Sequence, residues 1–346
     1  MAAGLRLPEL LEKIVEGPGL SREEAKAVAD AMLGGGLEDL DVAALLVAMR
    51  ARGETAEEIA GFAESLRGRM LRVRAPEGAI DTAGTGGDRS HTLNASTAAA
   101  LVAAAAGIPV AKHGNRSVSS RSGSADFLEA LGYRVDHGPE EAECMLREAG
   151  FAFLYAPRYH PAMKRVMPVR RRLGIRTVFN LVGPLSNPAM VARQVLGVAR
   201  AGLATPMMEA ARMLGYERLL LVHGLPGIDE VSVSGDTLVY ELQGGRVERY
   251  RVRPEQLGLG RHSLEELRVE DARESAERFL AVAQGGGRPA DRDFIAANAA
   301  AALYVAGRAG SLEEGARAAL ELLESGAVAE KLEEILEACR RCCGQG

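Results

Sequence analysis

Two glycine-rich, hydroxyl-rich loops constrain the fold of this chain most, because each follows a short β-type run and leads into a helical stretch. The first, at 81–88, reads Asp-Thr-Ala-Gly-Thr-Gly-Gly-Asp and continues through Asn-Ala-Ser-Thr at 94–97. The second, at 112–124, begins Lys-His-Gly-Asn-Arg-Ser. Glycines admit a ligand close to backbone N–H groups, and a helix N-terminus carries about half a positive charge. The two loops therefore suit a ligand with several phosphates.

The spacing of apolar residues predicts an α/β fold. The first seventy residues have helical periodicity, with capping-box starts at Ser21 and Thr55 and helices ending near 33, 52 and 71. Short β-type runs then alternate with helices, and 236–242 with 246–252 form a hairpin pattern. We expect a small all-helical domain at 1–72 and a large α/β domain at 73–346 with a largely parallel central sheet. The five β-type runs are 79–81, 109–112, 151–155, 195–198 and 219–222.

Charge and hydropathy exclude several classes of protein. The 346 residues carry a net charge of −5, which argues against nonspecific nucleic-acid binding. The longest uncharged region, 91–111, has an apolar part too short to span a bilayer. No secretory signal is recognisable at the N-terminus. We therefore expect a cytoplasmic enzyme without membrane or nucleic-acid partners.

The four cysteines are Cys144, Cys339, Cys342 and Cys343. The Cys-x-x-Cys-Cys tail is compatible with metal binding or redox chemistry, but no second Cys or His cluster accompanies it. Free thiols in a cytoplasmic protein are the expectation.

Two common nucleotide motifs are absent from the loops. After Gly84 and Gly86, a dinucleotide fingerprint needs a third glycine where Arg89 stands. No Gly-Lys-Ser or Gly-Lys-Thr follows either, so a nucleoside-triphosphate P-loop is not supported.

The order of the motifs is that of a known family. The runs Gly-Thr-Gly-Gly-Asp, Asn-x-Ser-Thr and Lys-His-Gly-Asn-Arg-Ser-Val-Ser-Ser closely resemble anthranilate phosphoribosyltransferases, and the resemblance extends to Arg170, 183–188 and 227–232. It implies transfer of a phosphoribosyl group from phosphoribosyl pyrophosphate (PRPP) to the amine of anthranilate, in the second step of tryptophan biosynthesis from chorismate. It also implies a helical insertion near 165–185 that joins the small domain, and a homodimer formed through that domain.

The resemblance places the donor between the two loops, although glycine turns and helix caps alone account for many of the same residues. Asp88, which phosphate repels, is expected to orient a ribose hydroxyl, a metal-bound water or a donor amide. The implied PRPP-binding residues are Gly84, Gly87, Asp88, Thr92, Asn94, Ser96, Thr97, Lys112, Asn115, Arg116, Ser117, Ser119, Ser120 and Ser124.

The acceptor residues are also implied by resemblance. Arg170 is the first of three consecutive arginines, a run typical of a charged surface, but an arginine fork matches the carboxylate of anthranilate. Gly84, Asn115, His113 and His160 are expected beside the aromatic ring. A lone histidine is more often structural than catalytic, so His113 is not assigned as a base.

A magnesium site is expected at Asp229 and Glu230, with Ser96 as a further ligand. Adjacent carboxylates are often a solvated turn, but Mg²⁺ commonly takes one or two carboxylates with waters and phosphates. The metal neutralises charge on the leaving pyrophosphate.

No residue is predicted as a clear acid or base. Catalysis is expected to rest on positioning by Lys112 and Arg170 and on electrostatics. Arg89 and Leu93 depart from the usual family pattern, where glycine and phenylalanine are common. Two alternatives remain: a pyrimidine nucleoside phosphorylase, and a catalytically silent relative that binds nucleic acid.

Overall fold

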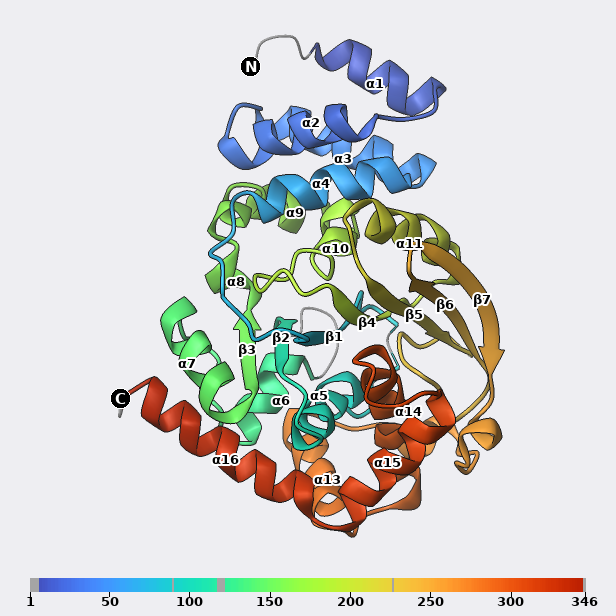
Figure 1. The fold of residues 1–346 in the computed structure, drawn as a ribbon. Helices are drawn as coiled ribbons and strands as arrows, with labels where there is room; N and C mark the ends of the chain where they lie inside the picture. The colour runs from blue at the N-terminus through green and yellow to red at the C-terminus, as the bar shows by residue number, and fades with distance from the viewer. Residues whose placement is uncertain (1–5, 89, 117–121, 226, 345–346) are drawn as a thin grey trace.

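The computed structural model describes residues 6–88, 90–116, 122–225 and 227–344, with helices around a central sheet (Figure 1). The strands are β1 (Ile80–Gly84), β2 (Val110–Gly114), β3 (Phe151–Tyr155), β4 (Arg193–Gly197), β5 (Arg218–Gly224), β6 (Thr237–Gln243) and β7 (Arg246–Val252). The first eight helices are α1 (Leu7–Glu16), α2 (Arg22–Gly34), α3 (Asp39–Arg52), α4 (Ala56–Arg67), α5 (Ala95–Ala105), α6 (Ser124–Ala130), α7 (Pro139–Ala149) and α8 (Ala156–Tyr159). The later ones are α9 (Met167–Leu173), α10 (Val178–Val182), α11 (Ala204–Met213), α12 (Leu264–Leu267), α13 (Ala272–Ala283), α14 (Pro289–Val305), α15 (Leu312–Glu324) and α16 (Ala327–Cys342). Short 3₁₀ segments lie at Pro161–Arg165, Ala201–Leu203 and Pro254–Leu257.

The seven strands form one sheet in the order β3-β2-β1-β4-β5-β6-β7. The pairings from β3 across to β5 are parallel, and the β6–β7 hairpin adds two antiparallel strands. This confirms the predicted fold class. The chain leaves β1 toward β2 on one side and later returns to β4 on the other, so a topological switch point lies between β1 and β4. Ligands of open α/β sheets bind at such a point.

The N-terminal helices begin where the sequence predicted. Ser21 and Glu24 form a reciprocal capping box, as do Thr55 and Glu58, and each pair satisfies two exposed N–H groups of its helix. The fourth helix is shorter than expected. It ends at Arg67 and not near 71, because Gly68 closes the last turn and Leu71 donates a backbone hydrogen bond to Tyr159 (2.9 Å).

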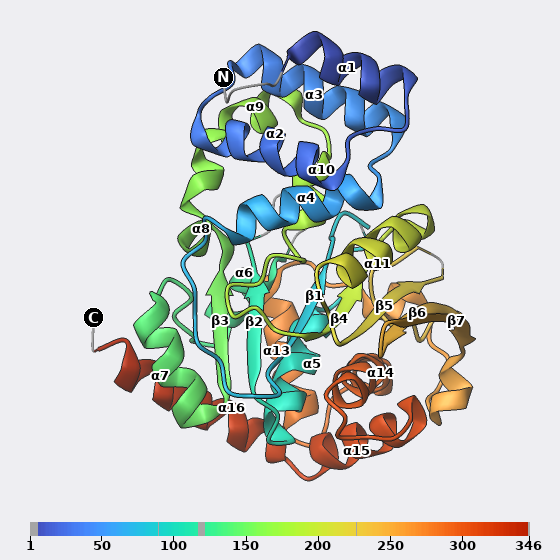
Figure 2. The same ribbon diagram turned by 45° about the horizontal axis from the view of Figure 1, so that its top comes forward.

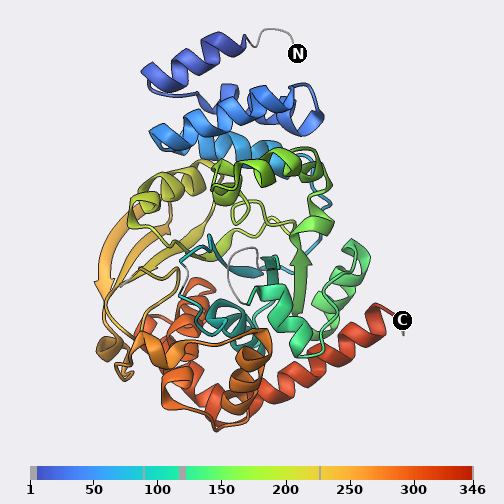
Figure 3. The same ribbon diagram turned by 180° about the vertical axis from the view of Figure 1, so that it is seen from behind.

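Two hydrophobic cores lie on the two faces of the sheet. One packs β1–β3 against α5, α7, α13, α14 and α16, and the other joins α1–α4 to α9, α10, α11 and one face of β4–β6. Helix α4 packs against α2, α10 and α11, and Figure 2 shows it between α2 and α11. From behind, the N-terminal helices are seen as a layer beyond the sheet, and α16 runs along the opposite side (Figure 3). None of the helices within the described ranges is both long and apolar enough to cross a membrane.

The prediction of four free thiols is wrong. Cys144 on α7 and Cys342 on α16 form a disulfide, while Cys339 and Cys343 are free. The partners are 198 residues apart and meet because α16 packs along α7. In the described part of the chain, the one cluster with metal-ligand spacing is Cys144, Glu148 and Cys342, and the disulfide occupies two of its three ligands.

Candidate active site

The residues singled out from the sequence gather where β1, β2, β4 and β5 end. Gly84 pairs with Gly197 in the parallel ladder, and both strands stop there. The segment with Asp229 and Glu230 follows β5 and folds back over these two ends. The site therefore lies at the topological switch point of the sheet.

The first glycine loop rests against Asp229. The Gly86 N–H donates to Asp229 Oδ2 at 2.7 Å. A Cβ on Gly84 would lie 2.5 Å from the same oxygen, and one on Gly197 would overlap the Asp229 carbonyl oxygen. The glycines at these strand ends are therefore required by the approach of Asp229, whatever ligand the loop binds.

Asp229, Glu230 and Asp88 form a cluster of like charge. Burial, reinforced by Asp88, raises the pKa of Asp229 to about 6. Burial together with Asp229 and Asp88 raises the pKa of Glu230 well above its usual range, although the Ser96 N–H and Lys112 oppose this. Within the described residues, Glu230 Oε2 is buried without a hydrogen-bond partner. A hard cation that prefers oxygen ligands would relieve this repulsion, so the donor set fits Mg²⁺.

Asp88 itself is turned toward its own loop. It accepts a hydrogen bond from Ser90 Oγ at 2.5 Å and one from the Ser90 N–H at 3.3 Å. Ser90 Oγ in turn lies 3.1 Å from Thr92 Oγ1. The two hydroxyls and the carboxylate thus form one small network at the end of the first loop.

The start of α5 binds the second loop. Asn94 occupies the N-cap position but makes no side-chain cap bond to the described helix, so the capping interpretation is wrong for its amide. Asn94 Oδ1 instead accepts from Ser122 Oγ (2.5 Å) and Ser275 Oγ (2.9 Å). Thr97 Oγ1 is buried without a partner in the described structure. Asn94 therefore connects the two glycine loops and α13.

Lys112 lies beneath the first loop. Its Nζ donates to the Thr82 carbonyl, and the Thr82 hydroxyl donates to the Ser96 carbonyl at 2.8 Å. Burial lowers the pKa of Lys112 to about 8 and raises that of Asp81 to about 6, while their mutual attraction opposes both shifts. Asp81 also accepts from Asn187 Nδ2 at 2.9 Å. Lys112 is thus a buried cation that connects β1, β2 and the start of α5.

In the described part of the second loop, Arg116 points toward α6 and not toward the first loop. Arg116 is exposed, stacks over the Tyr155 ring and pairs with Asp126 and Glu129, which raise its pKa. Ser124 Oγ donates to the Asn115 carbonyl at 3.1 Å. In this arrangement the guanidinium of Arg116 binds two acidic side chains of α6. Ser117, Ser119 and Ser120 lie outside the described residues, as does Arg89.

His113 and His160 face one another. Their Nε2 atoms are 3.2 Å apart and both side chains are buried. Burial lowers the pKa of His113 well below its usual value and that of His160 to about 4. Both rings are therefore neutral at pH 7, one donating and the other accepting.

Arg170 lies on α9 with its guanidinium over the Phe179 ring. It donates to Asn180 Oδ1 at 3.4 Å, and burial lowers its pKa. No described carboxylate lies within ion-pair distance of it. A partly buried arginine without a carboxylate partner is suited to bind a carboxylate ligand.

Sequence reasoning missed Arg176. Its guanidinium donates to the carbonyl oxygens of Thr85 (2.8 Å) and Gly86 in the first loop. Only its position beside the Thr177 to Asn180 helix start distinguishes it in the sequence from the other arginines of that region.

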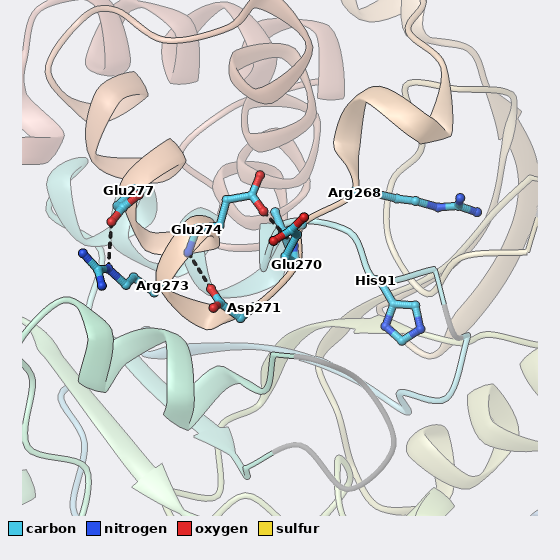
Figure 4. Close-up of a pocket in the computed structure, with 8 residues that line it drawn as sticks. His91, Arg268, Glu270, Asp271, Arg273, Glu274 and Glu277 are labelled. Atoms are coloured by element: carbon cyan, nitrogen blue, oxygen red, sulfur yellow. Dashed lines mark hydrogen bonds and ion pairs between the residues drawn. The ribbon is translucent and has the colours of Figure 1, made fainter.

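A cavity of about 820 Å³ lies next to the loops, at the start of α13 (Figure 4). Four carboxylates and two arginines contribute to its wall, and Arg273 is paired with Glu277 at 3.0 Å. The excess of carboxylates makes this cavity unfavourable for pyrophosphate. Its lining residues are His91, Arg268, Val269, Glu270, Asp271, Arg273, Glu274 and Glu277.

Comparisons with known proteins identify the family. Residues 76–329 match the α/β domain of a glycosyl transferase family, and residues 8–70 match its helical bundle domain. An anthranilate phosphoribosyltransferase of Aeropyrum pernix is 54% identical over 330 residues, covering 95% of this chain and 96% of that protein. The chain belongs to the anthranilate phosphoribosyltransferase family. This confirms the resemblance seen in the sequence.

Other members of the anthranilate phosphoribosyltransferase family extend the match. The enzyme of Rubrobacter xylanophilus is 50% identical, with 98% of this chain and 99% of that protein covered. The Thermus thermophilus crystal structure superimposes with a TM-score of 0.90 at 43% identity, covering 96% and 99%. The Saccharomyces cerevisiae enzyme, solved in complex with PRPP and Mg, gives a TM-score of 0.87 at 28% identity, covering 97% and 98%.

Proposed function

We propose that the site at the ends of β1, β2, β4 and β5 performs the reaction of this family. The chain transfers the phosphoribosyl group of PRPP to the amine of anthranilate, giving N-(5-phosphoribosyl)anthranilate and pyrophosphate in tryptophan biosynthesis. The observation that carries the assignment is the buried, unpartnered Glu230 Oε2 beside the first glycine loop and the start of α5, as far as the described residues extend. The strong similarity to anthranilate phosphoribosyltransferases supports it over the nucleoside phosphorylase and nucleic-acid alternatives.

The donor is held by the first loop and the helix start behind it. The exposed backbone at Gly84 and Gly87 and the hydroxyls of Ser96 and Thr97 provide donors for its phosphates. Asn94 keeps the second loop close, and Lys112 supplies positive charge from below. The remaining donor residues of this proposal are Asp88, Thr92, Asn115, Arg116, Ser117, Ser119, Ser120 and Ser124.

Asp229, Glu230 and Ser96 would hold Mg²⁺. A bound Mg²⁺ supplies neutralising charge for the leaving pyrophosphate. The Saccharomyces cerevisiae enzyme in complex with both PRPP and Mg supports this assignment.

Anthranilate binds on the side of Arg170. The guanidinium takes the carboxylate, and the neutral pair His113 and His160, with Gly84 and Asn115, lines the path of the aromatic ring. Because the pKa values of both histidines are lowered, neither repels the cationic guanidinium at neutral pH.

The chemical step depends on orientation and electrostatics. Arg170 orients the acceptor so that its neutral amine faces the anomeric carbon, and the glycine loop fixes the donor. Positive charge at Lys112 favours the departing pyrophosphate. No strong protein base is required, since the ortho carboxylate of anthranilate takes the proton of the amine.

The chain is divided into a small domain, residues 1–72 with the insertion near 165–185, and a large domain of the remaining residues to 346. Supporting this division, α9 and α10 pack against α3, and α10 also packs against α4.

The small domain forms a homodimer through the outer face of α1 and α3. Val15, Leu40 and Val47 leave 66%, 79% and 40% of their surface exposed there, which a second copy would cover. Sedimentation measurements test the dimer.

A cytoplasmic location fits a biosynthetic enzyme of this family. The Cys144–Cys342 disulfide is unusual for a cytoplasmic protein, although intracellular proteins of hyperthermophiles carry such bonds.

The loss of anthranilate fluorescence tests the reaction. Purified protein should consume anthranilate, seen as a loss of its fluorescence, only when both PRPP and Mg²⁺ are present, and EDTA should stop the reaction. Consumption in EDTA would contradict the metal assignment. If folded protein consumes no anthranilate, the assignment of anthranilate as the acceptor is contradicted.

A further inference from the structure

Arg176 binds carbonyl oxygens of the first glycine loop, and Asp229 binds one of its N–H groups. Its Nη1 and Nη2 atoms donate to consecutive carbonyl oxygens, those of Gly86 and Thr85. The N–H of the same Gly86 donates to Asp229 Oδ2 at 2.7 Å. Both polar groups of one loop residue are therefore held by side chains from other segments.

The loop has a shape that admits the guanidinium. A Cβ on Gly87 would overlap Arg176 Nη1, and Gly87 has φ +81°, a conformation that favours glycine. A side chain at 87 would displace the arginine. Gly86 also has positive φ (+61°), but a Cβ there would meet no described atom within 4 Å. Gly87 is thus the loop position at which a side chain would displace the Arg176 guanidinium.

Arg176 comes from the segment between α9 and α10, which packs on the helical domain. The next residue, Thr177, donates its N–H to Asn180 Oδ1 at 3.0 Å, and the same oxygen accepts from Arg170 at 3.4 Å. Val178 and Phe179 are buried in the core that contains α3 and α4. The arginine at the acceptor site and the arginine at the glycine loop therefore share one short, anchored segment.

Arg176 does not use its charge in an ion pair. Among the described residues, no carboxylate lies within ion-pair distance of it, and its guanidinium donates to loop carbonyls. By contrast, Arg193 and Arg212 pair with glutamates. The N–H groups of these two loop residues are also bonded, that of Thr85 to the Gly197 carbonyl at 2.9 Å and that of Gly86 to Asp229, so the backbone at 85–86 is held at both its donors and its acceptors.

We propose that Arg176 is a positioning residue that fixes the first glycine loop in the form that binds PRPP and fastens it to the helical domain. This inference rests on the proposed function, because it assumes that the loop binds the donor. Arg176 acts through the backbone of Thr85 and Gly86, so its replacement should weaken the binding of PRPP and not that of anthranilate.

Steady-state kinetics of Arg176→Ala, Arg176→Lys and the control Arg172→Ala test the proposal. Arg172 is an exposed arginine on α9. Arg176→Ala should raise the KM for PRPP on the order of tenfold, because two charge-assisted hydrogen bonds are lost. The KM for anthranilate should change less than about threefold, and Arg176→Lys should recover part of the loss. Arg172→Ala should behave as the parent.

Gly87→Ala provides an independent readout. The strain of an alanine at φ +81° acts in both backgrounds, but the guanidinium that its Cβ displaces is present only in the parent, so Gly87→Ala should raise the KM for PRPP more in the parent than in Arg176→Ala. If Arg176→Ala leaves the KM for PRPP unchanged, or if the Gly87→Ala effect is equal in both backgrounds, the positioning role is overturned.

Glu230→Gln separates this inference from the site assignment. If both Glu230→Gln and Arg176→Ala leave PRPP binding unchanged, the loop is not the donor site and the proposed function fails. If only Glu230→Gln weakens PRPP binding, the donor site stands and the role of Arg176 is rejected.

Discussion

The Gly86 N–H and Asp229 Oδ2 lie 2.7 Å apart, joining the first glycine loop to the acidic segment after β5. This bond uses one oxygen of Asp229, while the neighbouring Glu230 keeps Oε2 buried without a hydrogen-bond partner among the described residues. The loop and the acidic pair are therefore one structural unit, in which a cation, the donor and the loop conformation depend on one another.

Replacement of Glu230 separates stability from activity. Glu230→Gln replaces a carboxyl group whose ionisation is opposed by burial, Asp229 and Asp88, so in EDTA the variant should melt about 2 °C or more above the parent at pH 7. With Mg²⁺, kcat/KM should fall on the order of 10- to 100-fold. Thermal melts and kinetics check both effects, and a variant that is less stable without metal would contradict the repulsion.

The pH dependence of metal-free stability follows from the same cluster. The folded-state pKa of Asp229 is raised from 3.8 to about 6, so its acid form is favoured in the folded protein. The contribution of Asp229 to stability without metal should therefore be fully present below about pH 4 and be lost as the pH rises through 6. Urea unfolding in EDTA of the parent and of Asp229→Asn measures this, because the difference between them should shrink toward pH 4. A difference independent of pH would refute it.

Arg170→Ala should raise the KM for anthranilate on the order of 10- to 100-fold, because a charge-assisted bond to the carboxylate is lost. The KM for PRPP should change less than about threefold. Arg171→Ala, an exposed neighbour on the same helix, is the matched control. Equal effects on both substrates would count against the role assigned to Arg170.

The buried pair His160 and His113 should make the stability of the folded protein sensitive to acid. The folded-state pKa of His160 is lowered from 6.5 to about 4, so protonation opposes folding. Its contribution is present above pH 6.5 and is lost as the pH falls toward 4, to a limit of about 3 kcal/mol. With Mg²⁺ present, His160→Gln should show a shallower loss of stability than the parent over this range. If the stability of the parent and of His160→Gln falls in parallel with pH, the assignment of His113 and His160 as a neutral pair is contradicted.

The disulfide between Cys144 and Cys342 should stabilise the chain without affecting the chemistry. Closing a loop of 198 residues contributes about 5 kcal/mol in the chain-entropy treatment. Cys144→Ser should melt at a lower temperature, and reductant should lower the melting temperature of the parent but not of the variant. The unreduced, denatured protein should give thiol signal from Cys339 and Cys343 alone. Four reactive thiols would refute the bond.

The sequence predicts those features that depend on local pattern. The capping boxes at Ser21 and Thr55 require only residues three positions apart, and the strand-loop-helix order places the glycine loops at the sheet edge. Both signals are short in range, and both were confirmed.

The features that were missed depend on contacts between distant segments. Cys144 meets Cys342 only because α7 packs against α16, and Arg176 reaches Gly86 only because the α9–α10 segment folds over the loop. Asn94 has the identity and position of a helix cap, but Ser275, 181 residues away, competes for its amide. Local propensity cannot anticipate such a competitor.

The most direct test of the account is to locate the metal. Crystals of the complex with Mn²⁺ and PRPP would show the ion by its anomalous scattering. We expect one Mn²⁺ at about 2.0–2.3 Å from a Glu230 oxygen, with the donor pyrophosphate between it and the loop at Gly84 to Gly87. A donor bound with the metal away from Asp229 and Glu230 would contradict the assignment of these carboxylates as the metal site.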